Sequence, residues 1–93
     1  MGKVARQLTI GLLLAVASIA AISRSSAERA KFIRHSPCPS TGLHRGSCPG
    51  WEVDHIVPLC AGGADRTSNM QWLTVSDHRK KTTIDRRVCR RLG

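Results

Sequence analysis

The chain lacks three features that would place it in common classes of protein. Its longest uncharged apolar run, residues 8–22, has 15 residues, fewer than the roughly 20 that a membrane-spanning helix needs. It has no Cys-x-x-Cys pair, and its cysteine spacings of 10, 12 and 29 do not fit the usual ligand pairs of structural zinc. It also has only 6 acidic residues against 15 lysines and arginines. These absences disfavour a membrane anchor and a zinc-stapled domain, and they leave a strongly basic chain.

The first 27 residues have the layout of a secretory signal peptide. Two basic residues precede the apolar run, and Ser25 and Ala27 suit the last positions before a cleavage site after Ala27. The alternative is an uncleaved anchor, which would then be the only membrane contact of the protein. We expect export to the periplasm or the medium, with residues 28–93 as a mature protein of 66 residues.

Four cysteines lie in the expected mature part, residues 28–93, and predict two disulfides, because an exported chain folds under oxidising conditions. Three pairings are possible. Cys38 and Cys48 bracket a loop rich in proline and glycine and are natural partners, which leaves Cys60 with Cys89. Each bond would contribute about 3 kcal/mol by restricting the unfolded chain. A domain of this size buries only about 60% of the surface that its unfolded chain exposes, and it usually needs a covalent cross-link of this kind.

Two segments with alternating apolar and polar residues predict a β-hairpin. Residues 51–57 contain tryptophan, valine and isoleucine, and residues 70–75 alternate in the same way. The residues between them are rich in turn formers, so we expect the two strands to pair across a long loop. Trp51 and Trp72 fall near the two ends of this hairpin. We expect both to form the small core rather than to stack on bases.

A helix is predicted after the hairpin. Ser76 offers an N-cap, and the helical pattern covers residues 78–87 before a basic tail. Thr82 and Thr83 predict a weak point in this helix, because β-branched side chains lose rotamer freedom there. Residues 28–36 predict a second, shorter basic helix. The expected fold class is α+β, with a β-hairpin followed by a helix.

The residues that carry chemistry follow this order of elements. Asp54 and His55 lie in the first strand, Asn69 precedes the second, and His78 comes early in the helix. The two histidines and the asparagine are separated by 14 and 9 residues. The pattern, which covers residues 51–82, resembles the HNH endonucleases, whose ββα-metal site is named after three such positions.

The resemblance implies an endonuclease that hydrolyses phosphodiester bonds in DNA or RNA. It would use one divalent ion (Mg²⁺, Mn²⁺, Ni²⁺ or Zn²⁺) and no small-molecule cofactor. The catalytic residues would be His55 as the general base, Asn69 as the residue that ties the hairpin loop together, and His78. His78 and Asp54 would bind the metal. The ββα-metal core would fill residues 51–93, after an N-terminal basic segment and cysteine loop over residues 28–50.

Two points of the site stay open in the sequence. Asp54 and His55 are neighbours on a strand and therefore point to opposite faces, so a twist or bulge has to bring both to one cleft. Glu52 shares the face of Asp54, where an ion pair with an arginine is favoured over a role beside the metal. Relatives often carry two Cys-x-x-Cys pairs, and this chain has disulfide-type spacings in their place.

A basic run on the predicted helix indicates a track for phosphates, which would give salt-dependent and sequence-independent affinity. The residues of this run that we expect to bind nucleic acid are Arg79, Lys80, Lys81, Arg86 and Arg87. The alternative is a solvated helix face, and no element that reads bases is visible. Two other functions remain open. One is a non-catalytic basic module that binds nucleic acid, and the other is a small secreted cationic peptide, which would need a broader apolar face.

Overall fold

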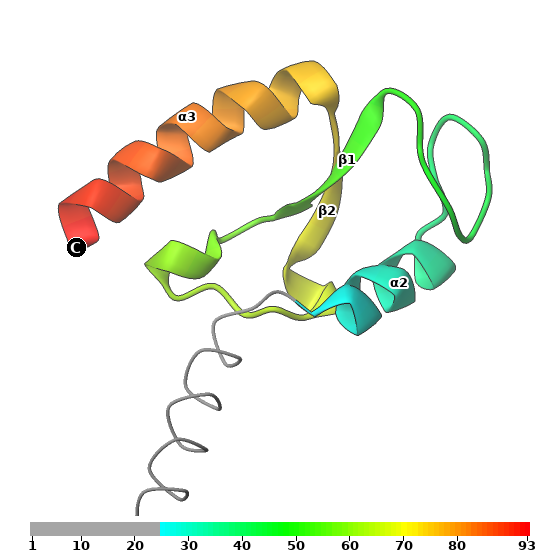
Figure 1. Ribbon diagram of the computed structural model, residues 1–93, viewed down its shortest axis with the longest axis horizontal. Coiled ribbons are helices and arrows are strands. Elements are labelled where there is room, and N and C mark those ends of the chain that lie inside the picture. Colours follow the sequence, from blue (N-terminus) through cyan, green and yellow to red (C-terminus); the bar gives the residue numbers. More distant parts are fainter. Residues whose placement is uncertain (1–24) are drawn as a thin grey trace, which may run out of the picture.

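The computed structural model describes residues 25–93, and the expected signal peptide lies almost wholly outside this range. The elements follow in the order α2 (Ser26–His35), β1 (Trp51–His55), the 3-10 helices η1 (Leu59–Ala61) and η2 (Thr67–Asn69), β2 (Met70–Thr74) and α3 (Val75–Leu92) (Figure 1). The predicted hairpin followed by a helix is confirmed. Within the described range, no helix combines the length and the apolar character needed to cross a membrane.

The hairpin separates the two helices. β1 and β2 are antiparallel, and their register pairs Val53 with Trp72 and Asp54 with Gln71. Because neighbouring residues on a strand face opposite sides, Val53 and Trp72 share one face, while Asp54 and Gln71 share the other. Figure 1 shows α2 on one side of the hairpin and α3 on the other. The apolar face packs against α2, and the polar face lies toward α3.

The core lies between α2 and the apolar face of the hairpin. Phe32, Ile33 and Met70 are buried, and Trp72 packs against them with its ring centroid 5.7 Å from that of Phe32. The indole nitrogen of Trp72 donates a hydrogen bond of 2.8 Å to a backbone carbonyl just after α2. The core position predicted for Trp72 is therefore confirmed. Trp51 is half-buried and lies outside this cluster of buried residues.

The helix α3 begins earlier than its sequence predicts. The expected cap at Ser76 is wrong, because the Thr74 hydroxyl accepts a hydrogen bond of 3.1 Å from the backbone N–H three residues further on. The expected weak point at Thr82 and Thr83 does not interrupt the helix. The Thr83 hydroxyl donates to the carbonyl one turn earlier, at 3.2 Å, and so stays satisfied within it. The early start places His78 in the first turn of α3.

Both expected disulfides are present. Cys38 is bonded to Cys48, and Cys60 to Cys89, as the sequence predicts. The first bond closes the loop before β1, and the second ties η1 to the end of α3. No residue of α3 is buried. The second disulfide and the polar contacts at the start of the helix therefore hold α3 against the hairpin.

The helix predicted over residues 28–36 is also present, and it starts two residues earlier. The Ser25 hydroxyl caps it by accepting a hydrogen bond of 3.3 Å from the Glu28 N–H. The Glu28 carboxylate accepts another, of 3.2 Å, from the N–H of Thr67 and ties α2 to η2. Cleavage after Ala27 stays a prediction; it would remove this cap and the first two residues of α2.

Candidate active site

A cleft of about 470 Å³ lies beside the end of β1, η1 and α3. Its lining includes three of the four residues predicted for the catalytic centre, Asp54, His55 and His78, together with Arg86. Asp54 comes from the strand and His78 from the first turn of α3. His78 lies over the polar face of the hairpin, where it is close to Glu52 and Asp54.

Asp54 is held in one orientation by its surroundings. Its side chain is buried, with 6% of the residue surface exposed. The Oδ2 atom accepts hydrogen bonds from Gln71 Nε2 at 3.0 Å and Lys81 Nζ at 3.1 Å. The other oxygen, Oδ1, lies 3.8 Å from His78 Nε2. That separation is too long for a hydrogen bond, so the two atoms face each other without being joined directly.

Glu52 fixes the ring of His78 from the other side. Its Oε2 atom lies 2.8 Å from His78 Nδ1, and the two side chains are partly exposed. A carboxylate on one ring nitrogen of a histidine sets the tautomer and leaves the other nitrogen with a lone pair, as is usual for metal-ligating histidines. The expected ion pair of Glu52 with an arginine is therefore wrong, because the start of α3 covers the face that Glu52 shares with Asp54.

Asp54 Oδ1 and His78 Nε2 are the two donor atoms that could hold one divalent ion. An ion about 2.0–2.2 Å from each donor can bridge atoms that are up to about 4 Å apart, and these two are separated by 3.8 Å. An oxygen and an imidazole nitrogen suit Mn²⁺, Ni²⁺ or Zn²⁺, and Mg²⁺ with more water. Among residues 25–93, no group of three or more acidic, histidine or cysteine side chains is placed to hold an ion.

His55 occupies the other face of β1, at the end of the strand. Its Nε2 atom lies 2.9 Å from Asp65 Oδ1, and only 12% of its side chain is exposed. Because of its terminal position it lines the cleft with Asp54 and also a smaller cavity of about 260 Å³ on the α2 side. No local pattern pairs Asp65 with His55, since Asp65 is a turn residue ten positions later.

Asn69 closes the loop that carries Asp65. Its amide accepts a hydrogen bond from the Val57 N–H at 3.0 Å and donates to the Val57 carbonyl at 2.9 Å. It also donates to a second loop carbonyl at 2.8 Å. Gly63 completes the closure, because a Cβ there would lie 1.9 Å from the Val57 oxygen. This tight loop places Asp65 against the imidazole of the strand.

Lys81 lies inside the site rather than on the basic face of α3. Its Nζ atom is 2.6 Å from Asp85 Oδ2 and 3.1 Å from Asp54 Oδ2, and it donates to the His55 carbonyl at 2.7 Å. Burial lowers the pKa of Lys81, but the bonds and charges of Asp85 and Asp54 outweigh it, so the pKa is raised above its ordinary value. The other members of the predicted phosphate track are exposed on α3: Arg79, Lys80, Arg86 and Arg87.

A family model of the HNH endonucleases matches residues 36–83 of the chain. The match covers just over half of the 93 residues and includes the hairpin, its loop and the first half of α3. The chain therefore belongs to the HNH endonuclease family. Comparison with curated proteins and with solved structures gives no match.

Proposed function

We propose that the chain is a metal-dependent endonuclease that hydrolyses phosphodiester bonds in DNA. The observation that carries this proposal is the separation of 3.8 Å between Asp54 Oδ1 and His78 Nε2, in a cleft that His55 also lines. RNA is the alternative substrate, because the phosphodiester chemistry is the same.

Asp54 and His78 would hold the metal, and the neighbouring residues prepare them for it. Glu52 keeps the His78 lone pair on Nε2, and Gln71 and Lys81 keep the Asp54 carboxylate turned so that Oδ1 faces it. When bound, a divalent ion would neutralise charge on the phosphoryl oxygens and stabilise the departing oxyanion. Two protein ligands leave coordination positions open for water and substrate.

His55 is the proposed general base. If the N–H on Nε2 donates to Asp65 Oδ1, at 2.9 Å, the lone pair that can take a proton from water lies on Nδ1. Asp65 is then a positioning residue that fixes the tautomer, the relation that the carboxylate–histidine pair of a catalytic triad uses. We expect Asp65→Asn to lower kcat with KM unchanged, and Asp65→Glu to restore part of the loss.

The exposed basic side chains of α3 would bind the phosphates that flank the cleaved bond. Arg86 lines the cleft itself, whereas Arg79, Lys80 and Arg87 extend the positive charge along the helix. We leave Lys81 out of this track, because its ammonium group is already paired with two carboxylates. Contacts of this kind read no bases, so the proposed cleavage has little sequence preference.

Export is also part of the proposal. All four cysteines are in disulfides, and such bonds persist in oxidising compartments. A nuclease that needs the Cys60–Cys89 bond to hold α3 in place would remain inactive while it is reduced. Full activity of the reduced protein would contradict this part of the proposal.

A plasmid-cleavage assay tests the proposed function. Purified protein is incubated with supercoiled DNA and Mg²⁺, Mn²⁺ or Ni²⁺, and nicked and linear products are measured. We expect cutting that EDTA stops and that His55→Ala abolishes. His35→Ala is the matched control, since His35 is exposed on α2 and lines no part of the cleft. Binding of DNA without cutting under any metal would support a non-catalytic module instead.

A further inference from the structure

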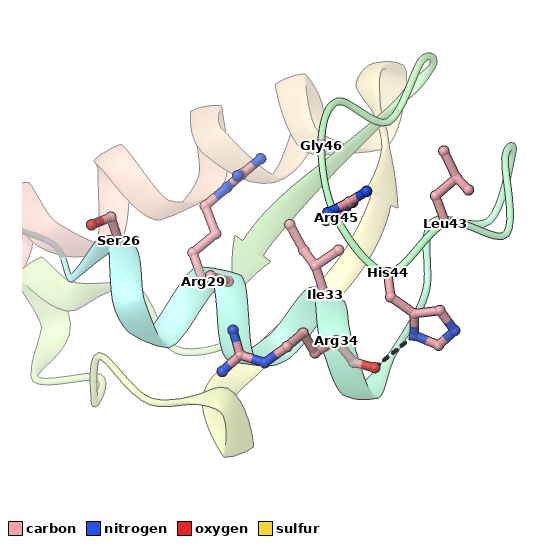
Figure 2. A pocket seen from close by; sticks show the side chains of 9 residues that line it. Ser26, Arg29, Ile33, Arg34, Leu43, His44, Arg45 and Gly46 are labelled. Carbon is pink, nitrogen blue, oxygen red and sulfur yellow. Dashed lines mark hydrogen bonds between the residues drawn. The ribbon is translucent and has the colours of Figure 1, made fainter.

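A second cavity, of about 680 Å³, lies between α2 and the loop that the Cys38–Cys48 disulfide closes. Its floor is apolar and includes Ile33 and Leu43, and three arginines surround it. Figure 2 shows Arg29 on α2 and Arg45 on the loop, with Ile33 between them. We call this cavity the arginine groove, and its arginines are Arg29, Arg34 and Arg45.

The charge of the arginine groove is not neutralised by the protein. No carboxylate lines it. Within residues 25–93, the ion pairs use the carboxylates of the hairpin, its loop and α3, and none of them includes an arginine of the groove. The three guanidinium groups are therefore available to an anion. Guanidinium matches a phosphate by two parallel hydrogen bonds, which makes arginine well suited to it.

The loop side of the groove is held in a fixed shape. The disulfide joins its two ends, and the Cys38 N–H donates to the Leu43 carbonyl at 2.9 Å. The His44 ring is 2.7 Å from the Arg34 carbonyl, which fastens the loop to the end of α2 (Figure 2). A site whose parts are already ordered loses little conformational entropy when a ligand binds.

The groove is linked to the candidate active site by residues that line more than one cavity. Arg29 lines both the groove and the smaller cavity that contains Asp65 and His55. His55 in turn lines both that cavity and the cleft with the proposed metal ligands. His55 and Arg29 therefore connect the lining of the cleft beside α3, by way of the smaller cavity, to the lining of the arginine groove.

We propose that the arginine groove binds the nucleic-acid strand on the side of the cleaved bond opposite to α3. The guanidinium groups of Arg34 and Arg45 contact backbone phosphates, and the apolar floor accommodates a sugar or a base. This inference rests on the proposed function, because it takes the strand past His55. It adds a second anchoring surface that lies outside the hairpin and α3.

Binding measured without cleavage tests the groove. The double variant Arg34→Gln/Arg45→Gln removes two arginines that do not line the cleft. Lys31→Gln/Arg66→Gln is the control, since it makes the same change of charge at exposed positions that do not line the groove. The affinity for a fluorescently labelled single-stranded DNA is measured by anisotropy in EDTA over a range of salt concentrations.

The groove variant is expected to bind about tenfold more weakly at about 0.1 M salt. Its slope of log affinity against log salt is expected to fall by about 1.4, or 0.7 for each lost phosphate contact. The control should lose about twofold or less. Equal losses in the two double variants, or no binding of DNA by the wild type, would overturn the proposal. Circular dichroism and thermal unfolding verify that both variants are folded.

Two further readouts separate this inference from the proposed function and from another ligand. Hydrolysis of bis(p-nitrophenyl) phosphate, which is too small to reach the groove, should be equal in the groove variant and the wild type. If neither protein cuts the ester but the groove variant still loses DNA binding, the binding role of the groove is supported and the proposed catalytic activity is wrong. If the variant instead loses binding only to phosphatidylserine vesicles and keeps that to DNA, the groove is a lipid site and the proposal is wrong.

Discussion

Glu52 offers a sharp test of the way the proposed metal site is built. Its carboxylate lies 2.8 Å from His78 Nδ1, on the side of the ring away from Asp54. Glu52→Ala removes the acceptor, so the ring can rotate and can place its proton on Nε2, the atom that would bind the metal. Both changes weaken metal binding, although Glu52 itself would not contact the ion.

The size of the effect follows from the exposure of the pair. Loss of a carboxylate behind a metal-ligating histidine typically costs 10- to 100-fold in metal affinity. The Glu52 side chain is 47% exposed, so water can replace part of the lost hydrogen bond. We therefore expect the lower end, about tenfold, which corresponds to about 1.4 kcal/mol of binding free energy. Partly exposed pairs of this kind contribute about 0–1 kcal/mol to folding, so the variant should stay folded.

The assay is an equilibrium titration of Mn²⁺ or Ni²⁺ against a chromophoric chelator. Glu52→Gln keeps an acceptor but removes the charge, and should fall between wild type and Glu52→Ala. Asp77→Asn is the matched control, because it removes an equal charge from an exposed position next to His78. Equal metal affinities of Glu52→Ala and Asp77→Asn would show that Glu52 acts through its charge alone and does not orient the His78 ring.

Three further predictions concern stability. Replacing Cys60 and Cys89 with serine should lower the unfolding free energy by about 3–4 kcal/mol, because their bond closes a 29-residue separation. Gly63→Ala should cost about 2–3 kcal/mol, because its Cβ would meet the Val57 carbonyl at 1.9 Å. The raised pKa of Lys81 stabilises the fold below the unfolded value of about 10.4, and this stability should be lost as pH rises through the folded pKa.

Urea titrations check these values, each against its own control. Replacing Cys38 and Cys48 with serine should lower the unfolding free energy by less than replacing Cys60 and Cys89, because the first pair closes a separation of only ten residues. Gly62→Ala should cost about 1–2 kcal/mol, for its positive φ of 85° alone. The alkaline loss should persist in Lys80→Met and be reduced in Lys81→Met. The reverse order in any pair would contradict the corresponding contact.

The order of the elements was predictable because each carries a strong local signal. The strands alternate, the turns contain glycine and asparagine, and the helix follows a capping residue. The start of α3 was predicted wrongly because Ser76 and Thr74 are both good caps. Which of them is used depends on where β2 ends.

The remaining contacts of the site join segments that are brought together only in the folded chain, so no local sequence pattern predicts them. Asp65 reaches His55 only because Asn69 and Gly63 draw the intervening loop tight. Lys81 belongs to a run of basic residues, and nothing in that run indicates that this one turns inward. The arginine groove combines α2 with a loop that has no periodicity, so the sequence showed its charges but not their grouping.

The binding of one metal ion by Asp54 and His78 is the central claim, and a stoichiometric Mn²⁺ titration followed by electron paramagnetic resonance tests it most directly. We expect one bound ion per chain in the wild type and in His55→Ala, and loss of that ion in Asp54→Asn and in His78→Ala. Tight binding of Mn²⁺ by the last two variants, with the affinity of the wild type, would contradict it.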